Sequence, residues 1–338
     1  MKNLKMMPAA GMILVLVVVL ISGCDLLGLA DPGTGDDGPL SSDITSATVL
    51  EKGTYTLNNS VYVEADLTIP PGTTLKFADG VWMDVTTDGG LGKITAVGTV
   101  DEPIIFTSSR STPSAGDWLG IIVHNNGSRF EYCRFQYADV ALEIIGNSVT
   151  VSRCTFASNR TGVKAQGTTS GFSVTNSTFN TNRDPLLINA SFDLDDSNTF
   201  TGNEHQRIEF DGSTIASARS WSETEVPIYF YNSCYVEAVL TLASGVTLAM
   251  GSGNWIDISA DPSGAIIANG TATESITFTS IAAVPAAGDW SGIVLHGGGS
   301  EFQYCQFKYA DTAITTNGYT SWDKGNNTFS NNNYNTDL

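Results

Sequence analysis

The chain has 338 residues, with 35 Asp and Glu against 16 Lys and Arg, which gives a formal net charge of −19. A hydrophobic fraction of 41% and a mean hydropathy near zero are too high for a disordered chain, so we expect a folded protein with a sizeable core. The acidic balance repels phosphate backbones, and no basic run compensates for it. Composition therefore excludes nucleic acid as a partner.

The first 24 residues have the pattern of an export signal. Lys2 and Lys5 precede an apolar run over residues 12–21, which is too short to span a bilayer. The run ends in Leu20-Ile21-Ser22-Gly23-Cys24, which resembles the lipobox of bacterial lipoproteins. The resemblance implies cleavage before Cys24 and diacylation of that cysteine, which would attach the protein to a membrane. The alternative is an uncleaved anchor with an incidental cysteine.

These signals divide the chain into four parts. Residues 1–23 are the predicted signal peptide, and residues 24–43, rich in Pro, Gly and Asp, are a flexible tether. The folded part divides into a first half over 44–215 and a second half over 216–338. We expect the protein at the cell envelope, on the outer membrane or cell surface rather than the inner membrane.

An internal duplication relates the two halves. Residues 98–142 align with 270–314 without gaps, at an offset of 172, with 25 identities in 45 positions. Upstream, residues 67–75 match 240–248 at an offset of 173. The chain is therefore a duplicated unit.

A finer repeat of about 22 residues runs through each half. Phenylalanines recur at this spacing, at Phe135, Phe156, Phe179 and Phe200, and again at Phe307 and Phe329. Most are followed three residues later by asparagine, for which we expect a left-handed turn conformation. Short alternating runs rich in β-branched residues surround them and favour strands. Such strands bury their apolar faces only when successive turns stack in parallel, which places the phenylalanines in one internal ladder.

This pattern predicts an all-β fold, a single-stranded right-handed parallel β-helix of about twelve turns. The sequence resembles the large group of right-handed β-helix repeat proteins. The resemblance rests on motifs that nearly all occur twice, namely Pro70-Pro-Gly-Thr-Thr-Leu75, Ile94-Thr-Ala-Val-Gly-Thr99, Pro103-Ile-Ile-Phe-Thr-Ser108 and Gly116-Asp-Trp-Leu-Gly-Ile121. It implies a fold that hosts lyases, hydrolases, adhesins and passive spacers alike.

Cys133 and Cys154 occupy equivalent positions on neighbouring turns, and their alternation with phenylalanine predicts small buried side chains, with a disulfide as the alternative. The duplicated His124 and His296 favour a structural role. No Cys or Cys/His cluster has the spacing of zinc ligands, so we expect no metal site and no cofactor. Ca²⁺ is the one ion that the fold resemblance brings into consideration.

A repeated turn carries Asp117 and Trp118 in the first half and Asp289 and Trp290 in the second. One interpretation is a turn with a packed indole. The other is a repeated sugar platform on one face of the rod, in which the ring stacks on a sugar and the carboxylate accepts hydrogen bonds from hydroxyl groups. Both interpretations are open.

Arg160 and Arg183 lie at equivalent positions on successive turns. They either clamp an acidic sugar or pair with nearby acids. A separate motif, Trp255-Ile256-Asp257, resembles one of the pectate lyases, but Ile258 stands where that family has histidine.

One unduplicated cluster is a candidate for catalysis. The β-helix resemblance implies that lyases and hydrolases of this fold place carboxylates along one face, sometimes with Ca²⁺ and a basic residue. The matching residues here are Asp193, Asp195, Asp196, Arg207 and Glu209.

The leading hypothesis is a non-enzymatic, lipid-anchored binding or spacer module, whose partner is a polysaccharide or a surface protein. The alternative is a polysaccharide lyase or glycoside hydrolase that uses the unduplicated cluster.

The lipobox gives the first testable prediction. Because the thiol of Cys24 is the attachment point, Cys24→Ser should abolish incorporation of labelled diacylglycerol. Unchanged lipid labelling of this variant would contradict the anchor.

Overall fold

A computed structural model describes residue 38 and residues 40–86, 92–125, 127–146, 148–165, 172–260 and 263–337. They belong to one compact unit, which spans residues 35–338. No helix within these residues is long and apolar enough to cross a membrane. The predicted signal peptide, Cys24 and most of the predicted tether lie outside the described residues.

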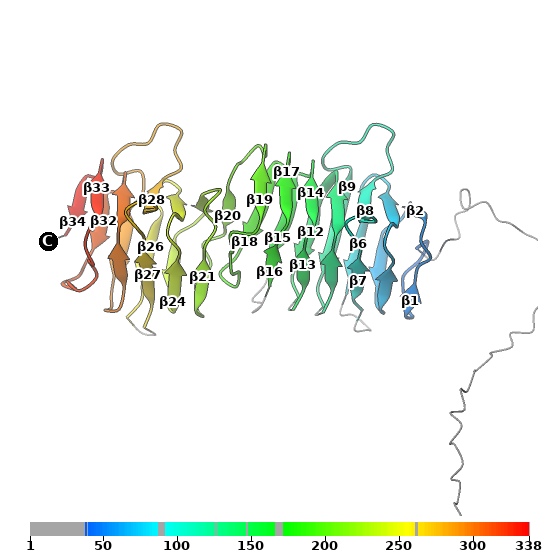
Figure 1. Cartoon of the computed structure of the whole chain (residues 1–338), viewed down its shortest axis with the longest axis horizontal. Coiled ribbons are helices and arrows are strands. Elements are labelled where there is room, and N and C mark those ends of the chain that lie inside the picture. The colour runs from blue at the N-terminus through cyan, green and yellow to red at the C-terminus, as the bar shows by residue number, and fades with distance from the viewer. Residues whose placement is uncertain are drawn as a thin grey trace, which may run out of the picture. The chain divides into compact units, whose positions relative to one another are not determined.

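The described chain winds as a coil whose turns stack one behind another (Figure 1). Its 34 strands form five sheets, and the strands pair in parallel with those of the preceding and following turns. Parallel strands joined by crossovers give a right-handed path. The all-β, right-handed parallel β-helix expected from the sequence is confirmed.

Three sheets begin in the first half of the coil. Sheet I consists of β1 (Thr48–Val49), β4 (Leu67–Ile69), β7 (Ile94–Val97), β10 (Arg129–Glu131), β13 (Thr150–Ser152) and β16 (Ser173–Thr175). Sheet II consists of β2 (Thr54–Leu57), β5 (Thr74–Phe77), β8 (Ile104–Ser108), β11 (Cys133–Gln136), β14 (Thr155–Ala157), β17 (Thr178–Asn180) and β19 (Thr199–Thr201). Sheet III runs through both halves and consists of β3 (Val61–Val63), β6 (Trp82–Val85), β9 (Trp118–Val123), β12 (Ala138–Ile144), β15 (Thr161–Ala165), β18 (Asp184–Ile188), β20 (Ile208–Phe210), β22 (Ile228–Phe230), β25 (Thr247–Met250), β28 (Ile276–Ser280), β31 (Cys305–Lys308) and β33 (Thr328–Ser330).

Two sheets belong to the second half. Sheet IV consists of β21 (Arg219–Trp221), β24 (Val239–Leu242), β27 (Ala265–Asn269) and β30 (Glu301–Gln303). Sheet V consists of β23 (Cys234–Val236), β26 (Trp255–Ile258), β29 (Gly292–Leu295), β32 (Thr312–Thr315) and β34 (Tyr334–Thr336).

The duplicated strands change sheets between the two halves. The sequence offset places β8 and β11 of sheet II onto β28 and β31 of sheet III, and β6 and β9 of sheet III onto β26 and β29 of sheet V. The exchange happens because β20 pairs with β18 on one side and with β22 on the other. We call the segment over residues 184–236, from β18 to β23, the junction.

Sheet II ends at β19, and side chains complete its last edge. The Phe200 amide donates to Glu225 Oε2 at 3.2 Å, and Gln206 Nε2 donates to the Phe200 carbonyl at 2.5 Å. These groups take the place of a next strand, so buried backbone polar groups stay paired where the sheet stops.

The phenylalanine ladder predicted from the 22-residue period is present. Ring centroids lie 4.9 Å apart between Phe135 and Phe156 and 5.0 Å apart between Phe156 and Phe179, with interplanar angles of 6° and 11°. A second stack in the other half joins Phe307 to Phe278 and Phe329. The spacing equals the distance between neighbouring strands, so each ring lies directly on the ring of the next turn.

The asparagines form a second ladder. The prediction that they adopt the left-handed backbone conformation is wrong, because that conformation occurs one residue earlier. The left-handed backbone belongs to the residue before each asparagine, with φ of 58° at Ser158 and 52° at Thr181. Asn159 and Asn182 are instead buried, and Asn159 Nδ2 donates to the Phe135 carbonyl and to Asn182 Oδ1, both at 3.0 Å. The amide is needed inside the turn because it pairs backbone groups of the preceding turn.

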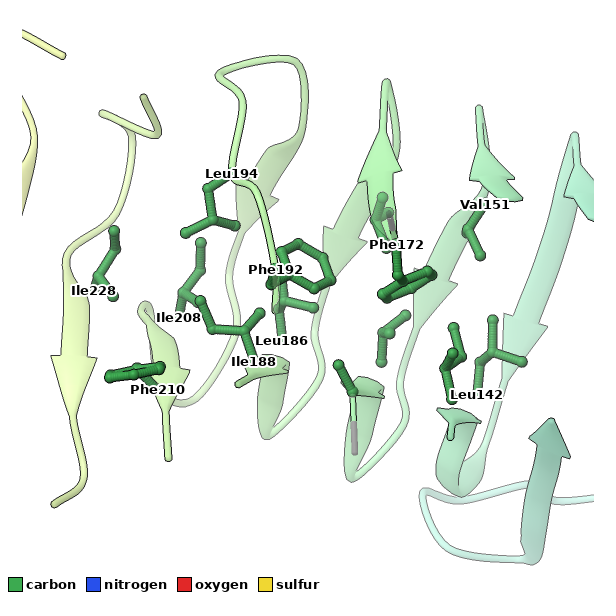
Figure 2. Packing of buried hydrophobic residues seen from close by; sticks show 14 of the residues in the cluster. Leu142, Val151, Phe172, Leu186, Ile188, Phe192, Leu194, Ile208, Phe210 and Ile228 are labelled. Atoms are coloured by element: carbon green, nitrogen blue, oxygen red, sulfur yellow. The ribbon is translucent and has the colours of Figure 1, made fainter. Parts of the chain in front are cut away.

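The interior stays apolar through the junction. Figure 2 shows its buried side chains stacked turn upon turn, among them Leu186, Ile188, Phe192, Leu194, Ile208, Phe210 and Ile228. The exchange of sheets therefore does not interrupt the core.

Cys133 and Cys154 are buried and unpaired, as the alternation predicted. Cys133 and Cys154 are free thiols, and each Sγ contacts a backbone carbonyl. Burial raises the pKa of the thiol of Cys305, the counterpart of Cys133 in the second half, to about 12. The Cys305 thiol is therefore protonated and unreactive at neutral pH.

The ladder gives a stability prediction. Phe156→Ala removes a fully buried ring and leaves a cavity between two turns, so we expect the free energy of unfolding to fall by about 3–5 kcal/mol. Val284→Ala, at a side chain that is 86% exposed, serves as the control and should change it little. Equal stability of the two variants in denaturant titration would contradict the ladder.

Candidate functional site

The repeated Asp-Trp turns are structural. Trp118 is fully buried, stacks on Phe77 with centroids 4.2 Å apart, and donates from Nε1 to the Gln136 carbonyl at 2.8 Å. Trp290 is also fully buried and makes the same bond to the Lys308 carbonyl at 2.8 Å. Buried indoles offer no face to a sugar, so the platform interpretation of these two residues is wrong.

The carboxylates beside these indoles hold their turns together. Asp117 accepts from Ser108 Oγ at 2.7 Å, and Asp289 accepts from Ser280 Oγ at the same distance. Burial acts to raise the pKa of Asp117, but hydrogen bonds from Ser108 and Ser114 outweigh it and leave that pKa below its usual value. The two turns also belong to different sheets, because Trp118 begins β9 of sheet III and Trp290 precedes β29 of sheet V. The expectation of one shared face was therefore wrong.

Both candidate arginines are paired with acids. Arg160 Nη1 lies 3.0 Å from Asp139 Oδ1, and Arg183 Nε lies 2.9 Å from Asp184 Oδ2. The structure therefore favours the second interpretation of these arginines, that they pair with nearby acids.

The structure divides the catalytic candidates into two groups. Asp193, Asp195 and Asp196 each hold local backbone, accepting from the amides of Ser220, Ser197 and Thr224. No hydrogen bond or ion pair within the described part of the chain joins them to Arg207 or Glu209.

Arg207 and Glu209 instead lie beside Asp184 and His205, which were not among the five catalytic candidates. His205 Nδ1 lies 2.5 Å from Asp184 Oδ1 and 4.0 Å from Glu209 Oε1. Arg207 Nη2 donates to Glu209 Oε1 at 2.7 Å, and its guanidinium lies 4.5 Å from the centroid of the Tyr229 ring. We call Asp184, His205, Arg207 and Glu209 the junction cluster.

A second arrangement on the outer face occurs twice. Tyr62 and Trp82 meet edge to face with centroids 4.9 Å apart, and Tyr235 and Trp255 repeat this contact at 4.9 Å. Their strands alternate, so the neighbouring valine, methionine and isoleucine residues face the core and the aromatic rings face outward. Tyr62 is 42% exposed and Tyr235 is 47% exposed.

Glycine keeps the neighbouring strand clear of both indoles. Gly120 is opposite Trp82 in the ladder, and Gly292 is opposite Trp255. A Cβ at Gly120 would lie 1.7 Å from the Val140 carbonyl oxygen, and φ is 126° there, so only glycine fits. No side chain of the next strand can therefore stand beside the indole at this register position.

Each aromatic pair has an acid and a histidine beside it. Asp84 is opposite Tyr62 in the ladder, and its Oδ1 lies 3.5 Å from His124 Nε2. In the other copy His296 Nε2 lies 3.1 Å from Asp257 Oδ2. We call Tyr62, Trp82, Asp84 and His124 the first aromatic surface, and Tyr235, Trp255, Asp257 and His296 the second.

The aromatic surfaces were detectable from the sequence. The offset of 173 that relates residues 67–75 to 240–248 also relates Tyr62, Trp82 and Asp84 to Tyr235, Trp255 and Asp257. Because side chains of a strand alternate between its two faces, these residues lie on the outward face while their apolar neighbours face the core. The offset therefore indicates the repeated outward aromatic residues as directly as it indicates the repeated Gly-Asp-Trp turn.

These features define a right-handed parallel β-helix repeat protein. Residues 42–150, about a third of the chain, match the family described as the pectate-lyase like beta helix domain. No curated protein and no solved structure matches the chain.

The junction also buries one acid without full pairing. Glu223 is fully buried, its Oε1 accepts from the Glu225 amide at 2.8 Å, and its Oε2 has no hydrogen-bond partner among the described residues. Burial raises the pKa of Glu223 from its ordinary value of 4.5 to about 7. The offset of 173 places Leu50 at the equivalent position in the first half, so a buried leucine there corresponds to a buried acid here.

Glu223 predicts a pH dependence of stability. Below pH 4.5 the side chain is protonated in both the folded and unfolded states, whereas between pH 4.5 and about 7 only the unfolded state has released its proton. The free energy of unfolding should therefore fall by about 3 kcal/mol across this window because of Glu223. Glu223→Gln, measured by denaturant titration at pH 4.5 and pH 8, should lose this component. An identical pH dependence of the variant and the parent would contradict it.

Proposed function

We propose that the protein is a non-enzymatic β-helix of the cell envelope, anchored by a lipid on Cys24, that binds neutral polysaccharides through its two aromatic surfaces. One observation carries the proposal. An outward Tyr–Trp pair with an adjacent Asp–His pair occurs in both copies of the duplication, at positions that the core does not require.

The chemistry of the surfaces suits a sugar. Indole and phenol rings present an apolar face for the C–H side of a pyranose, while the carboxylate and imidazole beside them pair with hydroxyl groups. A net charge of −19, with an acid in each surface, disfavours uronic acid polymers. The proposed ligand class is therefore neutral glycans.

The two surfaces act as separate sites on one rigid rod. Trp82 lies in sheet III and Trp255 in sheet V, about seven turns later, which corresponds to roughly 34 Å along the axis. Attachment of the rod to a membrane would present both sites to wall or surface polysaccharide, and a polymer that reached both would gain avidity.

Cleavage of a polysaccharide is the alternative. It is favoured by one observation, the two nearly buried carboxylates, Asp184 and Glu209, beside the half-exposed His205 in the junction cluster. Release of reducing ends or unsaturated sugars from any polysaccharide, lost in Glu209→Gln, would support the alternative against the leading proposal.

Titration calorimetry tests the binding proposal. A neutral oligosaccharide, chosen from a panel that includes polygalacturonate as the acidic comparison, should bind the full chain at two sites. Trp82→Ala and Trp255→Ala should each reduce the stoichiometry to one, because each removes one stacking face, and the double variant should not bind.

Tyr334→Ala is the control, since that ring is 65% exposed but lies outside both surfaces. Full binding by the folded double variant would contradict the assignment of the surfaces. Absence of binding to every polysaccharide of the panel at millimolar concentration would contradict a glycan ligand altogether.

A further inference from the structure

Three metal-ligating side chains converge in the junction cluster. Asp184 begins β18, His205 lies between β19 and β20, and Glu209 is the middle residue of β20. One ligand atom of each, two carboxylate oxygens and an imidazole nitrogen, lie within 4.8 Å of one another. We propose that these residues bind one divalent transition-metal ion, represented by Zn²⁺. This site is separate from the aromatic surfaces and does not depend on glycan binding.

The donor set selects the class of ion. Imidazole nitrogen is a good ligand for Zn²⁺ and its neighbours, whereas Ca²⁺ and Mg²⁺ take oxygen ligands. Zn²⁺ holds nitrogen and oxygen donors at about 2.0–2.2 Å, which separates the donors from each other by roughly 3–4 Å. The distances of 2.5 Å and 4.0 Å from His205 Nδ1 to Asp184 Oδ1 and Glu209 Oε1 lie on either side of this range. Binding would therefore move the imidazole away from Asp184 Oδ1, and at Glu209 Oε1 the ion would compete with the two N–H donors of Arg207.

Arg183 and Arg207 orient the carboxylate ligands of the proposed site. Arg183 Nε holds Asp184 Oδ2 at 2.9 Å and leaves Oδ1 directed at His205. Arg207 donates to Glu209 Oε1 through Nε at 3.0 Å and Nη2 at 2.7 Å, and Tyr229 supports the guanidinium. Such outer contacts fix ligand geometry in metal sites.

The three proposed ligands differ in their exposure. The side chains of Asp184 and Glu209 are 7% and 10% exposed, whereas that of His205 is 35% exposed. The carboxylates are thus shielded from water, and a cation interacts more strongly with shielded carboxylates than with hydrated ones. The imidazole stays accessible to an entering ion. A metal bound there would keep an open coordination position toward solvent.

The cluster is not a product of the repeat. In sheet III, Asp184 is opposite Thr161, and Glu209 lies between Leu187 and Tyr229. These neighbours are poor metal ligands. Asp184 and Glu209 therefore do not belong to a ladder of like residues on successive turns, in contrast to the asparagines. The three ligands meet only where the sheets exchange.

The three histidines of the chain make the test direct. Imidazole resonances of the full chain are followed by nuclear magnetic resonance while ZnCl₂ is added. The His205 signals should shift and saturate at one equivalent, and CaCl₂ should not reproduce the shift. His124 and His296, each paired with one carboxylate, are internal controls.

Variants locate the carboxylate ligands. Asp184→Asn and Glu209→Gln should each weaken Zn²⁺ binding at least tenfold, whereas Asp257→Asn, beside His296, should leave it unchanged. The proposal is wrong if His205 stays unmoved at millimolar Zn²⁺, if all three histidines respond equally, or if both folded variants retain full affinity. The experiment on the unaltered chain decides the question even where a variant does not fold.

Discussion

Strands of two to seven residues cannot bury an apolar face alone, and most of this structure follows from that constraint. Each turn is stable only against the turns on either side, so every interior position must meet an equivalent residue one strand spacing away. Flat rings suit this requirement, and Phe135, Phe156 and Phe179 stack nearly parallel. The asparagine ladder obeys the same rule with hydrogen bonds, each amide pairing backbone of the preceding turn.

Residues on outward positions need not match an equivalent residue on the next turn. The aromatic surfaces and the junction cluster both lie at such positions. The aromatic surfaces lie on strands whose alternate residues fill the core, so Trp82 and Trp255 are retained in both copies without a packing role in the interior. The junction cluster arises differently. It forms where sheet II stops and sheet III passes from one set of duplicated strands to the other, which brings Asp184 and Glu209 onto adjacent strands.

The sequence predicted the repeated features of the core, but not the repeated aromatic pairs on outward positions or the contacts that depend on the exchange of sheets. The period of about 22 residues was enough to predict the fold, the phenylalanine ladder and the buried thiols. Residues one period apart come into contact when successive turns stack. The conspicuous Gly-Asp-Trp repeat drew attention to Trp118, yet the alternation within β9 directs that indole inward onto Phe77. The contact between Asp184 and His205 has no periodic signal, since it exists only at the junction.

Glycan binding at the outward rings, and not at the buried Asp-Trp turns, is the central claim. The six tryptophans allow it to be tested in one spectrum. When a neutral oligosaccharide saturates the protein, the indole N–H signals of Trp82 and Trp255 should shift, while those of the buried Trp118, Trp221 and Trp290 should stay. Binding that leaves both outward indoles unmoved, or that shifts the buried ones instead, would contradict the account.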